Sequence, residues 1–472
     1  MDTFAECSAI NDLIYSGDEA TARDRTITLL DNLRSKGEPY SPLVNSIIRS
    51  VGLYPYLDGD TCDWIDRYAI EAFSSDVGGQ NRGVLHREQS RLLGKLLSGH
   101  DIAVSAPTSF GKSFVIDAFI ATKSPATVMI LVPTIALMDE TRRRIQSKFG
   151  SRYKIITSSD QELSDRTIFI FPQERALGYI DKIESIDLLV VDEFYKAGRV
   201  GKFFDGERSS ALIQAIVGLS SKCLQRYFLA PNVSELEGVG IFGGDIEFIK
   251  IDFNTVFLRK HDLHAQIGRD DGKRGEALIR ILSTVGGKSL VYAGTYTNIN
   301  KISLLINEKL PKLGEVLLSR FSEWLAINYS PTWELVSLAR RGVGVHNGSL
   351  HRSLAQIQVM LFERTDGLNI IVSTSSIIEG VNTSAENVIL WSNKSGVPKI
   401  DDFTYKNIIG RGGRMFRHFI GNIYILDRPP REEGRQLELG IPEEMLGTFD
   451  EAKTPIALTA EQTLKISAYR EK

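Results

Sequence analysis

The stretch of this chain that most constrains its fold is residues 104–113, where an apolar segment runs directly into the sequence Gly-Lys-Ser. Residues 102–106 have the composition of a buried parallel strand, and residues 112–123 have a helical pattern with one apolar side. A loop between such a strand and helix gathers the N–H groups of the turn and of the helix N-terminus at one point. That arrangement favours an anion such as a nucleotide phosphate. We therefore predict a phosphate-binding loop within an α/β domain.

The residue types of this loop match the parts of a bound nucleotide. Gly111 lets the backbone approach closely, Lys112 reaches the β- and γ-phosphates, and the Ser113 hydroxyl supplies one ligand of Mg²⁺. Ala106 stands where the general pattern G-x-x-x-x-G-K-[ST] has its first glycine, so a chance Gly-Lys-Ser at a helix start is the alternative for the motif alone. The residues predicted to hold ATP are Ala106, Pro107, Thr108, Ser109, Phe110, Gly111, Lys112 and Ser113.

The composition excludes several classes of protein. Of the 472 residues, 42% are hydrophobic and 24% are charged, which is typical of a globular protein of two or three domains. No apolar run approaches the roughly 20 residues of a membrane span, and the N-terminus lacks a basic-then-apolar secretory pattern. We therefore expect a cytoplasmic protein with no membrane partner.

The cysteines and the net charge limit the kinds of ligand. Cys7, Cys62 and Cys223 are far apart and form no C-x-x-C pair, which argues against a zinc knuckle, an iron-sulfur cluster or a disulfide framework. His346 and His351 have no second His or Cys at metal spacing, so we interpret both as structural. Because the net charge is -3, any contact with nucleic acid needs a local basic groove.

Two series of apolar segments alternate with helical patterns after residue 84, which predicts two mostly parallel sheets covered on both faces. The expected strands are 102–106, 127–132, 167–171, 186–192 and 226–230 in the first series, and 289–292, 343–346, 369–373, 387–391 and 422–426 in the second. The predicted domains are a helical module (1–83), a first lobe (84–255), a linker (256–280), a second lobe (281–428) and a tail (429–472). Residues 74–79 are expected to form a flexible joint, and residues 268–275 a charged, glycine-rich loop.

A pair of carboxylates, Asp192 and Glu193, directly follows the strand expected at 186–192. Two adjacent carboxylates at the end of a buried strand are costly unless they hold a cation or a reactive water. We predict that Asp192 completes the Mg²⁺ site with Ser113, while Glu193 orients and deprotonates the attacking water. The alternative is an exposed acidic loop after a strand.

The order of these motifs resembles a superfamily 2 helicase of the DExH-box, Ski-like type over residues 84–428. Gln89 resembles the adenine-reading glutamine of that family. Pro133 and Thr134 resemble motif Ia and Arg175 lies in a stretch that resembles motif Ib, both of which touch the sugar-phosphate backbone in the family. Residues 192–195 resemble motif II, with Phe-Tyr in place of its usual ending. The resemblance implies two RecA-like parallel-sheet lobes in tandem, preceded here by a helical module.

The second lobe continues the resemblance. Residues 345–350 resemble the turn before motif V, and 372–374 with 379–382 resemble motif V itself. In this stretch the resemblance places Thr374 at the nucleic-acid backbone and Gly380 at the nucleotide. Residues 407–414 resemble motif VI, with Asn407 in place of the usual glutamine.

Two arginines in motif VI, Arg411 and Arg414, lie beside glycines that permit close approach to another surface. If the two lobes face each other, the arginines reach the γ-phosphate and stabilise charge in the transition state. The alternative is a solvated loop or a structural salt bridge. With them, the predicted catalytic residues are Lys112, Asp192, Glu193, Arg411 and Arg414.

Two departures from the family bear on unwinding. Residues 229–232 read Leu-Ala-Pro-Asn where motif III has Ser-Ala-Thr, so the hydroxyls that link hydrolysis to strand separation are absent. The chain also ends about 44 residues after the last expected strand, whereas Ski-like helicases continue into further domains, so we expect a fragment of a longer protein. The segment 391–405 lies where related DNA helicases carry a strand-splitting hairpin; its aromatics Trp391, Phe403 and Tyr405 are interpreted as core, with base stacking as the alternative.

The resemblance implies an ATP-dependent nucleic-acid helicase or translocase that uses ATP and Mg²⁺. The alternative is a nucleic-acid-sensing ATP switch or clamp without processive unwinding, and a third is a phosphate-loop enzyme unrelated to nucleic acid. Single-stranded or partly duplex nucleic acid is the expected partner, with DNA slightly favoured and RNA left open. The Phe-Tyr after Glu193 and the Asn at the head of motif VI also resemble helicase subunits of bacterial antiphage systems such as Hachiman, so an effector or nuclease subunit is a candidate partner.

Overall fold

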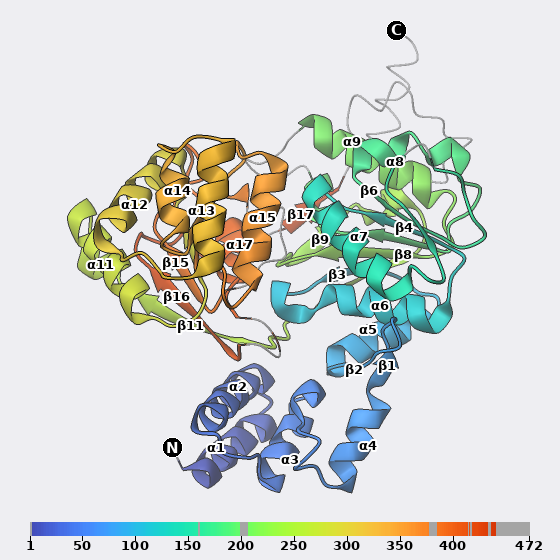
Figure 1. Cartoon of the computed structure of the whole chain (residues 1–472). Coiled ribbons are helices and arrows are strands. Elements are labelled where there is room, and N and C mark those ends of the chain that lie inside the picture. Colours follow the sequence, from blue (N-terminus) through green and yellow to red (C-terminus); the bar gives the residue numbers. More distant parts are fainter. Residues whose placement is uncertain are drawn as a thin grey trace. The chain divides into compact units, whose positions relative to one another are not determined.

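The computed structural model describes residues 2–158, 161–198, 206–376, 385–413, 415, 418–432 and 436–439. The chain divides into two compact units. Among the described residues, the first unit comprises 2–20, 40–253 and 436–439, and the second comprises 21–39 and 254–432. Each unit is built on a parallel sheet, so the predicted α/β fold with two parallel-sheet lobes is confirmed (Figure 1).

The first unit contains a seven-stranded parallel sheet in the order β10-β3-β8-β7-β4-β6-β5. Its strands are β3 (Asp101–Ser105), β4 (Thr127–Leu131), β5 (Lys154–Ile156), β6 (Thr167–Phe171), β7 (Leu188–Val191), β8 (Arg226–Ala230) and β10 (Ile246–Lys250). The inner strands carry continuous buried apolar runs, because helices cover the sheet. These helices are α5 (Arg87–Leu97), α6 (Lys112–Lys123), α7 (Ile135–Phe149), α8 (Gln173–Leu177) and α9 (Gly206–Ser220).

The second unit contains a six-stranded parallel sheet in the order β11-β16-β15-β12-β14-β13. Its strands are β11 (Phe257–Asp262), β12 (Ser289–Tyr292), β13 (Val343–His346), β14 (Ile370–Ser373), β15 (Asn387–Leu390) and β16 (Ile420–Ile425). Its helices are α10 (His264–Ile267), α11 (Asp271–Thr284), α12 (Tyr296–Lys309), α13 (Val316–Asn328), α14 (Glu334–Ala339), α15 (Arg352–Glu363) and α17 (Asp402–Ile409). Helix α14 packs against both α12 and α13, and Figure 1 shows the three together in front of the strands.

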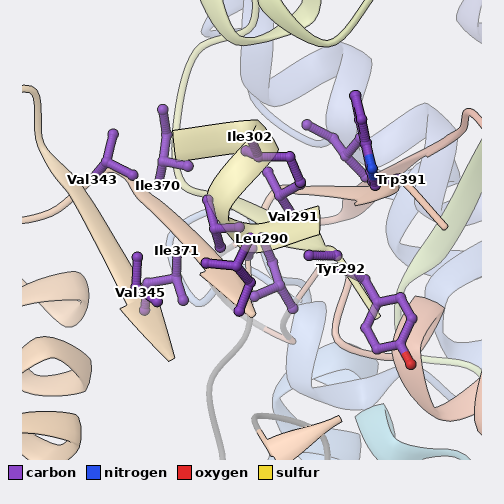
Figure 2. Packing of buried hydrophobic residues seen from close by; sticks show 14 of the residues in the cluster. Leu290, Val291, Tyr292, Ile302, Val343, Val345, Ile370, Ile371 and Trp391 are labelled. Carbon is purple, nitrogen blue, oxygen red and sulfur yellow. The ribbon is translucent and has the colours of Figure 1, made fainter. Parts of the chain in front are cut away.

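The core of the second unit lies between this sheet and its helices. Figure 2 shows Leu290 and Val291 of β12 beside Ile371 of β14 and Ile302 of α12. Apolar residues at period two on the strands meet apolar residues at helical spacing, which removes both sets from water. The carboxyl ends of the strands are therefore held in place by a buried apolar core.

The N-terminal residues are helical, as predicted, but they divide between the two units. Helices α1 (Thr3–Tyr15), α3 (Pro42–Ser50) and α4 (Trp64–Ala72) cluster with the first unit, while most of α2 (Glu19–Lys36) clusters with the second. In the second unit the Arg34 guanidinium lies 5.5 Å from the centroid of the Phe419 ring. The stretch predicted as one helical module is thus shared between the units.

Two predicted connections are corrected by the structure. The expected flexible joint is a hairpin, in which β1 (Ser74–Asp76) pairs antiparallel with β2 (Arg82–Val84). The expected linker at 256–280 holds strand β11 and the start of α11, and the units divide at residues 253 and 254 instead. Asp270 caps α11 by accepting from the N–H groups of Gly272 and Lys273, so the charged, glycine-rich sequence is a helix start.

Strands β5, β10 and β11, each at the edge of its sheet, were not predicted. Most of their side chains are exposed or only partly buried, so no apolar run marks these strands in the sequence. Residues 436–438, within the predicted tail, also form a strand that was not predicted. There β17 (Gln436–Glu438) pairs in parallel with β9 (Glu235–Glu237) of the first unit.

Candidate active site

The predicted phosphate loop lies between β3 and α6 in the first unit, as the sequence indicates. A short 3₁₀ turn at Thr108–Phe110 leads into Gly111, whose φ of 77° is in the left-handed region that favours glycine. Gly111 is the N-cap of α6 and has no side chain with which to cap the helix. The N-terminus of α6 is therefore available to an anion, and the arrangement fits a nucleotide phosphate.

The Lys112 amine lies where two strands end. Its Nζ donates to the Ala106 carbonyl at 3.1 Å and to the Ala230 carbonyl at 3.4 Å. Ala106 follows β3, and Ala230 ends the neighbouring strand β8. The lysine is thus held as a cation at the carboxyl edge of the sheet, which is where parallel sheets bind ligands.

The predicted carboxylates follow β7, on the other side of β8. Glu193 has a φ of 57°, a left-handed conformation that is costly for a residue with a side chain, and such residues cluster at functional sites. Asp192 accepts a hydrogen bond from the Glu193 N–H at 2.9 Å. Burial, and after it the Glu193 carboxylate, raises the pKa of Asp192 to about 6, while the Lys112 ammonium opposes this shift.

These residues fit a nucleotide with a divalent cation. Asp192 is half-buried, and its surroundings disfavour the ionised carboxylate although Lys112 is nearby. Such a pair suits a ligand that brings both a cation and phosphates, because their charges balance those of the two side chains. The second predicted Mg²⁺ ligand, Ser113, lies in the first turn of α6. Mg²⁺ takes few protein ligands and keeps phosphate and water oxygens, so one hydroxyl and one carboxylate are a suitable donor set.

Gln89 is fully buried in the first turn of α5, and both ends of its amide have partners within the first unit. Its Nε2 donates to the Phe110 carbonyl at 2.9 Å, and its Oε1 accepts from the His86 N–H at 3.2 Å. The predicted reading of adenine by Gln89 stays a prediction. The contacts give this side chain a part in positioning the phosphate loop.

Tyr227 of β8 was not identified from the sequence. Tyr227 pairs with Val190 of β7, so the two side chains lie on the same face of the sheet. Asp192 is two residues after Val190, and strand alternation places it on that face too. The side chain is fully buried and its hydroxyl has no hydrogen-bond partner among the residues that the structure describes. Burial, with a further contribution from the Asp192 charge, raises the pKa of Tyr227, so the phenol remains neutral.

The residues predicted to contact nucleic acid in the first unit lie after β4 and β6. Thr134 caps α7 by accepting from the Leu137 N–H at 3.2 Å. Arg175 is exposed in α8 and donates to the Thr157 carbonyl.

The structure adds one arginine near these residues that the sequence did not single out. Arg208 of α9 donates to the Pro133 carbonyl at 2.7 Å and to the Glu174 carboxylate at 3.2 Å. It joins the segments that resemble motifs Ia and Ib, and the two residues that it links, Pro133 and Glu174, are 41 positions apart in sequence. The sequence carries no periodic signal for such a link.

In the second unit, the predicted contact Thr374 lies just after β14. Its hydroxyl is 3.5 Å from that of Ser376, which is 2.9 Å from Nδ1 of His346 at the end of β13. Burial lowers the pKa of His346 to about 4, so this imidazole is neutral at physiological pH. The structural role predicted for it stays a prediction. Gly380 lies outside the described residues.

Motif VI begins in α17 and continues through Arg411, which is half-buried. The two glycines after it pack closely within the second unit: a Cβ on Gly412 would lie 2.7 Å from Ile423, and one on Gly413 would lie 2.1 Å from Val256. Their freedom from a side chain is therefore needed for packing. Arg414 lies outside the described residues.

The aromatic residues between motifs V and VI are buried. Trp391 is 2% exposed, Phe403 7% and Tyr405 5%, so their interpretation as core is confirmed. The segment also forms a tight projection, because Lys394 and Lys399 form an antiparallel bridge and Ser395 donates to the Pro398 carbonyl at 2.9 Å. Val397 at its tip is 93% exposed.

Comparison with known families agrees with this geometry. The model of the DEAD/DEAH box helicase matches residues 86–209, which include the phosphate loop and both carboxylates. The chain carries a DEAD/DEAH box helicase domain. The predicted helicase resemblance is confirmed. The model of the anti-bacteriophage protein B N-terminal domain matches residues 1–67, ahead of the helicase domain.

Several curated proteins are similar to the helicase domain and its surroundings. Anti-bacteriophage protein B of Escherichia coli strain K12 is 34% identical over 448 residues, covering 93% of this chain and 59% of that protein. The ATP-dependent DNA helicase Hel308 of Pyrococcus abyssi is 23% identical, over 70% of this chain and 49% of the helicase. DNA polymerase theta of Caenorhabditis elegans is 21% identical, over 77% of this chain and 25% of that protein. The chain thus spans about three fifths or less of the length of these relatives.

Within the part of the chain that the structure describes, no helix combines the length and the apolar character needed to cross a membrane.

Proposed function

We propose that this chain is the motor part of an ATP-dependent nucleic-acid helicase or translocase that acts in antiphage defence. The observation that carries the proposal is the position of Lys112, held between the ends of β3 and β8, with Asp192 and Glu193 at the end of the adjoining strand β7. The helicase domain match and the similarity to anti-bacteriophage protein B support it.

In this proposal each residue has a separate part in ATP hydrolysis. The N-terminus of α6 and Lys112 bind the phosphates, and Glu193 accepts a proton from the attacking water. Ser113 and Asp192 hold Mg²⁺, which neutralises charge on the transferred phosphoryl group when bound. Arg411 and Arg414 stabilise the charge that develops in the transition state.

The sugar-phosphate backbone of the nucleic acid contacts side chains of both units. Thr134 and Arg175 of the first unit and Thr374 of the second are the proposed contacts, and Arg208 fixes the segments that carry the first two. Because these side chains meet phosphates, affinity should be nearly independent of base sequence and should fall steeply with salt. A strong preference for one base sequence at fixed salt would contradict these contacts.

The finer assignments rest on the relatives. DNA is the favoured substrate, because the similar proteins include a DNA helicase and a DNA polymerase. We further propose a cytoplasmic location and an effector or nuclease subunit as partner, as expected of an antiphage protein.

One assay with several substrates tests the proposal. ATP turnover is measured with single-stranded DNA, duplex DNA and RNA in turn, with Lys112→Ala as the control that lacks the phosphate-binding cation. We expect stimulation by single-stranded DNA that the control does not show. Turnover that no nucleic acid alters would favour a phosphate-loop enzyme unrelated to nucleic acid.

The second candidate function is a nucleic-acid-sensing ATP switch that does not unwind processively. The sequence at the end of β8 favours it, since residues 229–232 lack the hydroxyls that motif III carries and Asn232 adopts a left-handed φ of 49°. Against it stands the projection at 394–399, whose exposed Val397 suits a wedge between strands.

Strand displacement on duplexes of increasing length separates the two functions. A motor confined to these 472 residues should open short duplexes and lose yield as length grows, whereas a switch opens none. Val397→Ser should reduce opening without changing ATP turnover if the projection is the wedge. Robust unwinding of long duplexes by this chain alone would show that no further domain or partner is needed.

A further inference from the structure

The first turn of α5 carries a histidine with an unusual set of contacts. His86 is the N-cap of α5: its Nδ1 accepts from the Gln89 N–H at 3.3 Å, and its Nε2 lies 3.2 Å from the Phe110 carbonyl. Because Nδ1 accepts, the proton is on Nε2, which donates to Phe110. The ring is fully buried, so this pattern is held away from water.

Gln89 reinforces the same contact. Its Nε2 also donates to the Phe110 carbonyl, at 2.9 Å, and lies 3.4 Å from the Gly111 carbonyl. Two side chains from one helical turn therefore hold the carbonyl that immediately precedes Gly111 and Lys112. A Cβ on Gly111 would lie 2.7 Å from the Gln89 amide, so the loop is seated directly on this pair. We call His86 and Gln89 the α5 brace.

The His86 ring of the α5 brace also contacts Phe253, where the first unit ends. The Phe253 ring stacks on the His86 ring, with centroids 4.5 Å apart and an interplanar angle of 14°. The Phe110 ring meets His86 edge-on at 4.8 Å. Phe253 is 2% exposed and is the last residue of the first unit before the chain enters the second unit at residue 254.

We propose that His86 is a positioning residue that couples the phosphate loop to the connection between the two units. Any shift of the Phe110 carbonyl on nucleotide binding displaces an imidazole that is stacked on Phe253, and the covalent chain carries this displacement to residue 254. Gln89 shares the polar contact with Phe110, and the His86 ring joins that contact to Phe253. The inference rests on the proposed ATP-dependent function.

The variant that isolates the coupling is Phe253→Leu in the full chain. It removes the stacked ring while leaving the brace and the phosphate loop unchanged. Its matched control is Phe242→Leu, because Phe242 is equally buried in the first unit but packs against Phe228 and has no ring contact with His86. Both changes remove a buried aromatic ring, so a loss of stability alone affects both.

Two measurements follow. Basal ATP turnover of Phe253→Leu should stay within about twofold of the parent, while its stimulation by single-stranded DNA falls about tenfold relative to Phe242→Leu. Independently, saturation with a non-hydrolysable ATP analogue should change amide hydrogen exchange in β11 of the parent and of Phe242→Leu, and leave it unchanged in Phe253→Leu.

Two substitutions of His86 remove its two contacts one at a time. His86→Phe keeps a ring against Phe253 but cannot donate to Phe110, whereas His86→Asn can cap α5 but offers no ring. Both should weaken the change in β11 exchange. Normal coupling in Phe253→Leu would overturn the inference and leave the ATPase proposal intact. Failure of the parent to bind nucleotide would overturn the proposed function as well.

Discussion

Helices α6 and α12 each follow an inner strand of a parallel sheet, but their N-termini differ. The N-cap of α6 is Gly111, which has no side chain to cap the helix, whereas the N-cap of α12 is Thr295, whose hydroxyl accepts from the Asn298 N–H at 3.1 Å. A capped terminus has already satisfied part of its donors, and an uncapped one is ready for an external anion. The same local architecture therefore gives the proposed phosphate site in the first unit and a capped helix start in the second.

The polar groups at the ends of the strands follow the same division. The first sheet places Lys112, Asp192 and Glu193 near one another, and the pKa of Asp192 is raised to about 6. The ends of β13 and β14 carry neutral His346 and Thr374 instead. Burial raises the pKa of Asp192 at the first sheet and lowers the pKa of His346 at the second. The first unit thus carries the residues that we propose for phosphate chemistry, and the second contributes the predicted motif VI arginines.

The largest expected effect tests whether the second unit contributes to chemistry at all. Arg411→Ala and Arg414→Ala should each lower kcat about 10³-fold or more with little change in ATP affinity, because an arginine finger acts on the transition state. Steady-state turnover and nucleotide titration measure the two quantities. A variant with near-normal turnover would place that arginine away from the bound phosphates.

The next effect sharpens the division of roles within the first unit. Glu193→Gln should lower kcat about 10²- to 10³-fold and leave ATP bound, because it removes a general base but no phosphate contact. Lys112→Ala should instead lose ATP binding. Equal loss of binding in the two variants, measured by titration with a fluorescent nucleotide, would refute the separate roles.

An acid-dependent effect is expected from the second unit. The pKa of His346 is lowered to about 4, below its unfolded value, so the unfolded chain binds more protons between these values and stability is lost as pH falls. The loss between pH 7 and pH 5 should be about 2 kcal/mol. His346→Asn should lessen this loss in thermal melts at the two pH values, while the exposed His351→Asn should not. Identical pH dependence in both variants would exclude His346 as its source.

The smallest effect compares two helix caps directly. Thr295→Ala and Thr134→Ala each remove a side-chain cap and should cost about 1 kcal/mol of stability. Only Thr134→Ala should also weaken binding of single-stranded DNA, since Thr134 is the one proposed to meet the nucleic-acid backbone. Equal DNA affinity in the two variants, measured at fixed salt, would leave Thr134 as a cap and nothing more.

Much of the first unit was predictable because its signals are local. The apolar runs of β3, β4, β6, β7 and β8 were expected within one or two residues of their observed positions, since a strand buried on both faces is marked by composition alone. The edge strands β5, β10 and β11 escaped prediction, because partial exposure removes that mark. Asp270 shows the converse error, in which a helix cap among glycines and charges was mistaken for a linker.

The sequence by itself determined the order of the motifs and the chemistry of Lys112, Asp192 and Glu193, because each follows a strand and parallel strands end at one edge. Only the tertiary structure decided which distant side chains support them. The stacking of Phe253 on His86, the link from Arg208 to Pro133 and the burial of Tyr227 beside Asp192 join residues with no periodic relation in the chain. Such contacts depend on how helices and strands pack, and packing is set by the whole core rather than by any local pattern.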